Sequence, residues 1–425
     1  MQIRDASSTN ESDDADSTSI YDYSQNQRGW LFSAIAIGTL LGTLPITELF
    51  SRFGMRRVMT IYGLLSATAT LLSPLAASYG FIWMFVMRVL QGFAFTATFA
   101  ANGAVTMNWA TLAGSGLFVG LLSCHVQLAS MFTMPLASAF CISSVGWTGA
   151  FYLQGAMTLL ISLLLFYFFR DSPKDHRYVT ETELKMIDAE KSHTAEKRYR
   201  TPYLAILSDL PTIGLCLSWV GESFVFQIFF QYGPVYLNKV LHYDVGVTGV
   251  AIAITFLFSF AGKILTGQFC DNATCISEKG RILFLTVLCT VIQIGCFVVL
   301  NVISEDQAFI GWIAYSVALI MVGVVSVAIF KGAHLVARQF LPFVMTLFIL
   351  LTAISILALH PLVNFFIQTN APEEWAMLFY ILCGIMVAFN VFFCFTCKTE
   401  AATWTKTQSC DMVQPSNQDI LHVKV

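Results

Sequence analysis

The stretch that decides the fold runs from Ile282 to Val302 and reads ILFLTVLCTVIQIGCFVVLNV, without a charged residue. An α-helix needs about 20 apolar residues to cross a hydrocarbon layer about 30 Å thick, and this stretch is long enough. Ten further apolar stretches lie between Trp30 and Thr396. The 425-residue chain is 56% hydrophobic and only 12% charged, whereas soluble domains carry about 25% charged residues. We therefore predict an all-α polytopic membrane protein with about 11 spans.

Short polar breaks separate the apolar stretches and set the ends of the predicted spans. The run at 340–367 is long, and we expect Pro342 and Pro361 to bend it or to mark its ends. The predicted spans cover residues 30–50, 58–77, 81–105, 117–139, 147–169, 211–231, 246–269, 282–302, 309–330, 340–367 and 375–396.

Lys and Arg residues predict the orientation of these spans. We assign alternate loops to the cytoplasm, beginning with the loop at Arg52–Arg57 and including the loop 331–338. Eighteen of the 23 Lys and Arg residues then lie on the cytoplasmic side and three on the other. Because cytoplasmic loops are rich in Lys and Arg, the N-terminus is predicted to be extracellular or luminal and the C-terminus cytoplasmic.

One long polar segment, residues 170–210, divides five predicted spans from six. Within it, Thr180-Glu-Thr-Glu183 is typical of a capping box and predicts a short surface helix. Two bundles joined by a charged linker are typical of transporters built from repeated halves. The predicted segments are a luminal or extracellular tail (1–29), an N-terminal bundle (30–169), a cytoplasmic linker (170–210), a C-terminal bundle (211–397) and a cytoplasmic tail (398–425).

The sequence offers little support for catalysis. It contains no Walker loop, and no Ser-His-Asp arrangement or metal-like His/Cys spacing can be assembled from it. The net charge of −3 gives no indication of nucleic-acid binding. We therefore expect no enzyme activity, no cofactor and no bound metal, with the lipid bilayer as the surrounding partner.

Several short motifs follow one another at family-like spacing: Gly29-Trp30, Arg52-Phe-Gly54, Arg88-Val-Leu-Gln-Gly92, Gly146-Trp-Thr-Gly-Ala-Phe-Tyr152 and Pro234-Val-Tyr236. In this order they resemble the major facilitator superfamily. More narrowly, they resemble its anion:cation symporter branch, which includes sodium/phosphate cotransporter relatives, sialin and vesicular glutamate transporters.

The resemblance implies a two-bundle fold with twelve spans, of which the first is missing from this sequence. The tail 1–29 corresponds to the luminal loop between the first two family helices. Asn10-Glu-Ser12 is a glycosylation sequon, and Asn10 is predicted to be modified if the tail is translocated.

The resemblance also implies a function, namely secondary transport of a small organic or inorganic anion by alternating access, coupled to H⁺ or Na⁺. Phosphate, urate-like acids, sialic acid and other carboxylates all remain open as substrates. The plasma membrane and a lysosomal or vesicular membrane are both open as locations. A non-transporting protein that retains the carrier scaffold is the alternative, because Phe95 lies where the family often has Glu, and Ala333-His-Leu-Val336 keeps only the histidine of a family pattern.

Two charged residues within predicted spans are the main candidates for the chemistry. Arg88 lies about seven residues into its span, where a cation costs several kcal/mol unless it is paired or hydrated. We expect it to face the bundle interior and attract the anion, although a structural charge near the outer rim is the alternative. Glu222 lies in mid-span and is the candidate for coupling. We hypothesise that it pairs with Arg88 across a cavity, or else lies in a wet cavity without a coupling role.

The remaining candidates are polar residues at helix positions that could line the same path. Gln127, Gln227 and Gln231 are predicted to bind substrate, with interhelical hydrogen bonding as the alternative. We interpret His125 as a packed histidine, and Lys263 as a structural residue whose ammonium reaches the cytoplasmic edge. The residues predicted to form the cytoplasmic gate are Arg52, Gly54, Arg56, Arg57 and Asp271.

Overall fold

The computed structural model describes residues 23–110, 115–189, 201–273, 275–303, 307–369 and 371–406. Throughout these ranges the regular structure is helical and contains no strand, which confirms the all-α prediction. Asn10 lies outside the described residues, so its predicted glycosylation stays a prediction.

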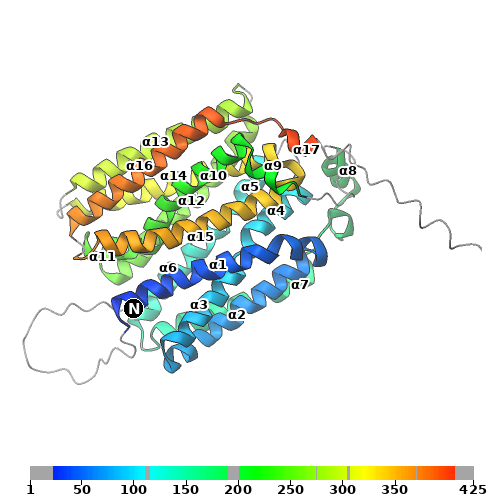
Figure 1. The fold of residues 1–425 in the computed structure, drawn as a ribbon. Coiled ribbons are helices and arrows are strands. Elements are labelled where there is room, and N and C mark those ends of the chain that lie inside the picture. Colours follow the sequence, from blue (N-terminus) through cyan, green and yellow to red (C-terminus); the bar gives the residue numbers. More distant parts are fainter. Residues whose placement is uncertain are drawn as a thin grey trace, which may run out of the picture.

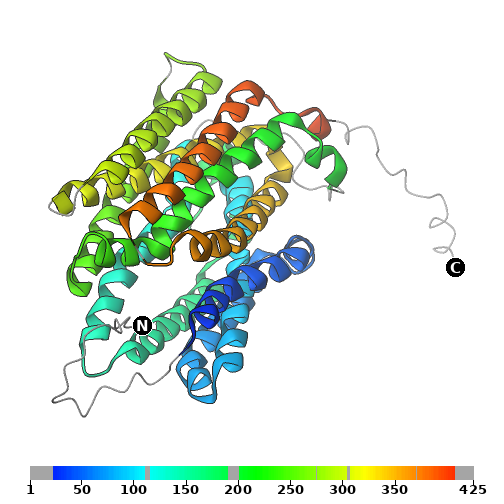
Figure 2. The ribbon, with the colours of Figure 1, turned by 60° about the vertical axis from the view of Figure 1, so that its left-hand side comes forward.

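The helices before residue 170 pack together as one group, coloured blue to teal in Figures 1 and 2. Two predicted spans are each broken into two helices, the span 81–105 at Thr96 and the span 117–139 at Cys124. The helices of this group are α1 (Gln25–Phe53), α2 (Met55–Tyr79), α3 (Phe81–Phe95), α4 (Ala97–Trp109), α5 (Ser115–Ser123), α6 (His125–Ile142) and α7 (Trp147–Phe168).

The long helices after residue 209 form a second group, coloured green to red. Its first helix passes through a π-helical segment, Ile228–Tyr232. Such segments are rare and frequently lie at functional sites. The helices of this group are α10 (Leu210–Gln227), α11 (Gly233–Lys239), α12 (Val245–Asn272), α13 (Glu278–Val302), α14 (Ala308–Ala337), α15 (Leu341–Phe366) and α16 (Pro372–Thr396).

Ten continuous helical runs in the described chain are long and apolar enough to cross a membrane. One run, Ala308–Phe366, has 59 residues, and at 1.5 Å per residue it would be about 88 Å long, far more than a bilayer needs. Arg338 has a φ of 47° at the junction where α14 ends and the chain turns into α15. Counted as two crossings, this run brings the total to the eleven that the sequence predicts.

One predicted loop is wrong. The segment 331–338 belongs almost entirely to α14, and Lys331 is a buried helix residue rather than a loop cation. Its charge is neutralised by Asp271 of α12, with 2.7 Å between Nζ and Oδ1. Hydropathy places the end of the span before this lysine because a charge lowers the local average, although an internal ion pair lets the helix continue.

Short helices mark one end of the molecule. α8 (Glu181–Ala189), α9 (Tyr203–Leu207) and α17 (Thr403–Lys406) lie there together (Figure 1). Following the charge distribution, we call this the cytoplasmic end, and we call the end where α1 begins the luminal end. The Glu183 N–H donates to Thr180 Oγ1 at 3.3 Å, so one of the two predicted capping-box bonds is present.

Apolar side chains cover the outward faces of both groups. Leu44 is 81% and Phe395 is 85% exposed, and large exposed apolar surfaces of this kind mark contact with lipid or a partner. With the ten apolar runs, they identify a multi-pass membrane protein. Inside, the two groups meet where α1 and α4 pack on α15, and where α5 and α6 pack on α12. These contacts leave a space between the groups.

Candidate functional site

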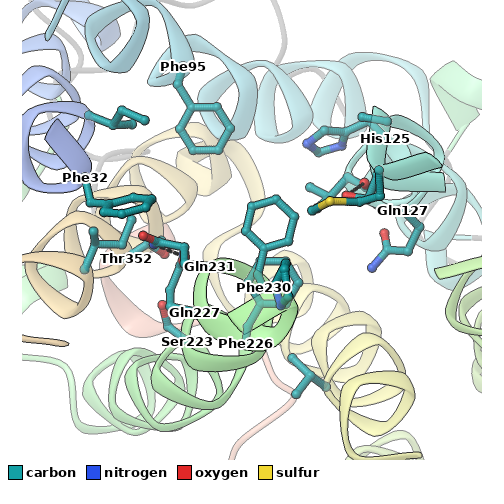
Figure 3. Close-up of a pocket in the computed structure, with 18 of the residues that line it drawn as sticks. Phe32, Phe95, His125, Gln127, Ser223, Phe226, Gln227, Phe230, Gln231 and Thr352 are labelled. Atoms are coloured by element: carbon teal, nitrogen blue, oxygen red, sulfur yellow. Dashed lines mark hydrogen bonds between the residues drawn. The ribbon is translucent and has the colours of Figure 1, made fainter. Parts of the chain in front are cut away.

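A cavity of about 1030 Å³ lies between the two helix groups. Its centre is aromatic, with Phe95 on one side facing Phe226 of α10 and Phe230 of the π-helical segment on the other, and Phe32 of α1 at the edge (Figure 3). The cavity reaches the luminal helix ends at Gly146 and Trp147 and extends inward to Ser123 and Lys263. A concave, mostly apolar space with a few polar groups is typical of a small-molecule site.

Arg88 lines the luminal part of this cavity, about 10 Å along α3 from its start at Phe81. Its Nη1 donates to Gln91 Oε1 at 3.3 Å, and its guanidinium lies 5.4 Å from the centre of the Phe151 ring. Gln91 is held in turn by Thr70 and Ser73 of α2. Within the described chain no carboxylate lies within ion-pair distance of Arg88, so its positive charge is available to a ligand.

Glu222 also borders the cavity but is fully buried. Its Oε1 accepts from Asn390 Nδ2 of α16, and its Oε2 accepts from Gln293 Nε2 of α13, both at 3.0 Å. The hypothesis that Glu222 pairs with Arg88 is therefore wrong. Both carboxylate oxygens are occupied within the C-terminal helix group, where unsatisfied polar atoms would be costly.

The amides around Glu222 belong to a larger polar network. Asn390 also donates to Thr290 Oγ1 at 2.8 Å and accepts from Ser218 Oγ at 2.6 Å. Gln293 is fully buried, and its Oε1 has no hydrogen-bond partner among the described residues. Two neutral N–H donors thus hold the Glu222 carboxylate beside the cavity, and a proton or small cation that binds there would have to displace one of them.

The three predicted glutamines all line the cavity (Figure 3). Gln231 Nε2 of the π-helical segment donates to Gln227 Oε1 at the end of α10 at 2.7 Å, so one donor and one acceptor of these two amides are already used. Gln127 of α6 is buried, and its Oε1 lacks a partner in the described structure. The geometry leaves Gln127 the more available of the three, and substrate binding by any of them stays a prediction.

His125 begins α6 and also borders the cavity. Its Nδ1 lies 2.9 Å from the Leu122 carbonyl. Because a carbonyl only accepts, Nδ1 must carry the hydrogen. Nε2 is buried without a described partner, so the histidine is anchored at one nitrogen and free at the other.

Lys263 is the functional candidate that sequence reasoning misplaced. The residue is only 4% exposed and borders the cavity, so its ammonium does not reach the cytoplasmic edge. The ammonium donates instead to the carbonyl and hydroxyl oxygens of Ser123, at 2.9 and 3.2 Å. The cation from α12 thus binds the opposite helix group. The available signal was its place in the span, nine residues before the end of α12 and thus about 13 Å from that end.

The residues of the predicted cytoplasmic gate separate into two sets. Asp271 of α12 crosses between the groups and accepts the N–H groups of Gly116 and Leu117 at 2.9 and 2.8 Å. Arg281 also donates to the neighbouring Cys270 carbonyl. Asp271 therefore ties the N-terminal end of α5 to the end of α12.

The gate residues of the first half make their contacts within that half. Gly54, with a φ of 81°, forms the turn between α1 and α2. The Arg56 N–H donates to Asp171 at 2.7 Å, and Arg56 Nε donates to the Phe166 carbonyl at 2.7 Å. Arg52 and Arg57 are exposed. Their role in a gate stays a prediction.

Comparison with known proteins gives related transporters. Residues 16–331 match the family described as "Major Facilitator Superfamily". The chain is 26% identical to sodium-dependent phosphate transport protein 1 of Mus musculus over 401 residues, covering 91% of this chain and 84% of that protein. It is 23% identical to human (Homo sapiens) sialin over 391 residues, covering 90% and 78%. It is also 24% identical to a probable small intestine urate exporter of Mus musculus, covering 91% and 79%.

Solved structures give the same fold. The proton:xylose symporter XylE, bound to 6-bromo-6-deoxy-D-glucose, superimposes with a TM-score of 0.68 at 12% identity, covering 92% of this chain and 91% of that one. The likeness at this identity concerns the arrangement of helices alone.

Proposed function

Since the chain belongs to the major facilitator superfamily, we propose that it is a secondary active transporter that carries a small organic or inorganic anion by alternating access. The relatives are named for transport of phosphate and export of urate. These names and the cavity between the two helix groups support a carrier rather than an enzyme.

The observation that carries the proposal is the charge of the cavity wall. Two cations, Arg88 and Lys263, border the cavity, and no described carboxylate forms an ion pair with either. The acidic residue of the described wall, Glu222, is already occupied by two amide donors. These donors are neutral, so two cations and one carboxylate leave the described wall with a net positive charge. A cavity with low-dielectric walls and an excess of one charge concentrates ions of the opposite sign. The preferred solute is therefore an anion.

The two cations lie near opposite ends of the path. Arg88 is about 10 Å from the luminal start of α3, and Lys263 is about 27 Å from the luminal start of α12. An anion entering from the luminal end meets Arg88 first. The cavity reaches the luminal helix ends, and Asp271 ties the two helix groups together at the cytoplasmic end, which supports a luminal-facing arrangement.

Glu222 is the proposed coupling residue, with H⁺ or Na⁺ as the coupling ion. Its carboxylate accepts from the side-chain amides of Gln293 and Asn390, and the Asn390 amide also donates to the Thr290 hydroxyl. An intramembrane carboxylate is expensive to keep and commonly marks an ion pathway. The coupling cation would bind at Glu222, and the anion would bind separately in the cavity at Arg88.

The test is uptake of labelled phosphate, urate, sialic acid and glutamate into proteoliposomes that contain the purified chain, with and without a Na⁺ or H⁺ gradient. At least one anion should accumulate, and Arg88→Ala should lose most of that uptake while reconstituting equally well. Lys279→Ala, which removes an exposed cation outside the cavity, serves as the control. Unchanged uptake in Arg88→Ala would reject Arg88 as the anion site, and the absence of any flux would favour a scaffold that no longer transports.

A further inference from the structure

We propose that Lys263 is a second anion site at the closed end of the cavity, and that the anion releases a latch when it binds there. In the structure the Lys263 ammonium holds Ser123 of the opposite helix group. An oxyanion such as a carboxylate or phosphate would take the place of Ser123 and so loosen the contact between α5 and α12. This inference rests on the proposed anion transport and adds the step that links binding to opening.

The first support is the poor match between Lys263 and its partners. An ammonium has three N–H donors, and here the two recorded acceptors are oxygens of one neutral residue, Ser123. A buried charge is well compensated only by an opposite charge with good hydrogen bonds. The other buried lysine, Lys331, has such a partner in Asp271. Lys263 has none in the described ranges, and an arriving anion would supply it.

The second support is an unused hydrogen-bonding group beside Lys263. Ser259 lies one turn earlier on α12, is fully buried, and its Oγ has no described partner. Both side chains border Gly323 of α14, where an added Cβ would collide with Ser259 Oγ and lie 3.6 Å from Lys263 Cε. Because Gly323, which borders the cavity, has no side chain, the Ser259 hydroxyl and the stem of Lys263 pack at the same point of α14. An oxyanion held by the Lys263 ammonium would therefore have a hydroxyl donor close by.

The third support is the place of the Ser123 carbonyl. Carbonyl groups in the last turn of a helix lack partners from their own helix, and Ser123 is the last residue of α5. Lys263 thus binds an acceptor that the helix junction at Cys124 makes available. The bond joins the two helix groups, and both of its residues border the cavity.

Below this bond α5 and α12 touch through their main chains. An added Cβ on Gly267 would lie 2.8 Å from the Gly116 carbonyl, and one on Gly120 would lie 3.2 Å from the Lys263 carbonyl. Asp271 closes the cytoplasmic end of the same contact. The contact therefore has one polar tie at each end, and only the tie at Lys263 faces the cavity. A ligand can favour the open state only by binding it more tightly than the closed one, and replacing a carbonyl by an anion at Lys263 provides that difference.

A native thiol can report on the opening. Cys270 is 1% exposed, and an added Cβ on Gly116 would lie 3.0 Å from its Cβ, so it lies within the contact. Cys275, which is exposed near the same membrane face, serves as the reference thiol. Two reporter proteins, one keeping only Cys270 and one keeping only Cys275, would be labelled from the cytoplasmic side with a membrane-impermeant maleimide.

We expect a transported anion from the phosphate, urate, sialic acid and glutamate panel to speed Cys270 labelling several-fold and to leave Cys275 labelling unchanged. In Lys263→Met, Cys270 should react several-fold faster without anion, and the anion should add no further increase. Lys263→Arg should keep the anion response, and Lys279→Met should behave like the parent protein.

An anion response that survives in Lys263→Met would overturn the second site while leaving transport through Arg88 intact. Equal Cys270 labelling in Lys263→Met and its parent without anion would overturn the latch, even if no anion of the panel is carried. Cys275 labelling and monodisperse elution show whether the variants are folded.

Discussion

Arg88 and Lys263 carry the same charge in the same cavity, yet the structure uses them differently. Arg88 is held by Gln91 of its own helix and by an aromatic ring, so its contacts stay within one helix group. Lys263 reaches across to Ser123 and is part of the contact between the groups. A ligand at Arg88 can therefore bind without moving the halves, whereas a ligand at Lys263 must compete with a contact that holds them together. Arg88 thus serves the first binding of the anion, whereas Lys263 serves the opening of the contact between the halves.

Reversing the charge at Arg88 should have the largest effect on anion uptake of the changes considered for the two cations. In Arg88→Glu, the luminal part of the cavity would repel the solute, and loss of a buried charge partner is worth about 2–5 kcal/mol, or more than about 30-fold in affinity. Initial uptake rates over a range of anion concentrations measure this effect. The exposed control Lys279→Glu should stay near the parent value, and a comparable loss in the control would show that the effect is not specific to the cavity.

Lys263→Met should lower the maximal uptake rate rather than the apparent affinity for the anion. Because Arg88 still recruits the anion, the concentration for half-maximal uptake should change by less than about 3-fold. The variant opens without anion but lacks the bond to Ser123 that re-forms the luminal-facing state, so the maximal rate should fall about 10-fold, a barrier change of about 1.4 kcal/mol. Uptake curves in proteoliposomes give both values. A large rise in the half-maximal concentration at an unchanged maximal rate would assign Lys263 the same role as Arg88.

Glu222 should matter for folding stability as well as coupling, unlike Arg88. Glu222→Leu leaves the Asn390 and Gln293 donors without their acceptor, and each buried unsatisfied group costs about 1–3 kcal/mol. The thermal midpoint in detergent should fall by several degrees, whereas Arg88→Ala should leave it almost unchanged. Equal midpoints for Glu222→Leu and the parent protein would contradict the network described here.

The two cytoplasmic acids provide a smaller and matched test. Asp271 receives N–H groups from the opposite helix group, whereas Asp171 receives the Arg56 N–H within the first half. In Asp271→Asn the charge that Lys331 neutralises is gone, so Cys270 labelling should increase about 2- to 5-fold, equivalent to about 0.5–1 kcal/mol. Asp171→Asn should leave labelling unchanged. The same increase in labelling in both variants would contradict a specific role of Asp271 in holding the two helix groups together.

Much of the fold follows from the sequence alone. Stretches such as Ile282–Val302 fix the spans through their length and lack of charge, and the helices found there differ from the prediction mainly at their ends. The break at Cys124 and the continuation of α14 past Lys331 do not follow, because hydropathy averages over a window and registers neither a helix junction nor an internal ion pair.

The candidate site is only partly predictable. The depth of Arg88 in its span indicates a cation inside the bundle, but a single sequence gives no direction for a side chain and no partner for it. Glu222 finds its two amides 71 and 168 residues away along the chain. Lys263 finds Ser123 140 residues away, so its interpretation as an edge residue rested on its distance from Asp271 alone.

The glycine contact between α5 and α12 has a mechanical consequence. At Gly116, Gly120 and Gly267 the main chains of α5 and α12 lie in close contact, because none of the three residues has a side chain to hold the helices apart. The helices α5 and α12 could therefore shift or tilt against each other along this main-chain contact. A methyl group added at Gly267 would press on the main chain of Gly116 and Leu117 and hold the two helices apart at the cytoplasmic end, without contact to Arg88 or to the Lys263 side chain.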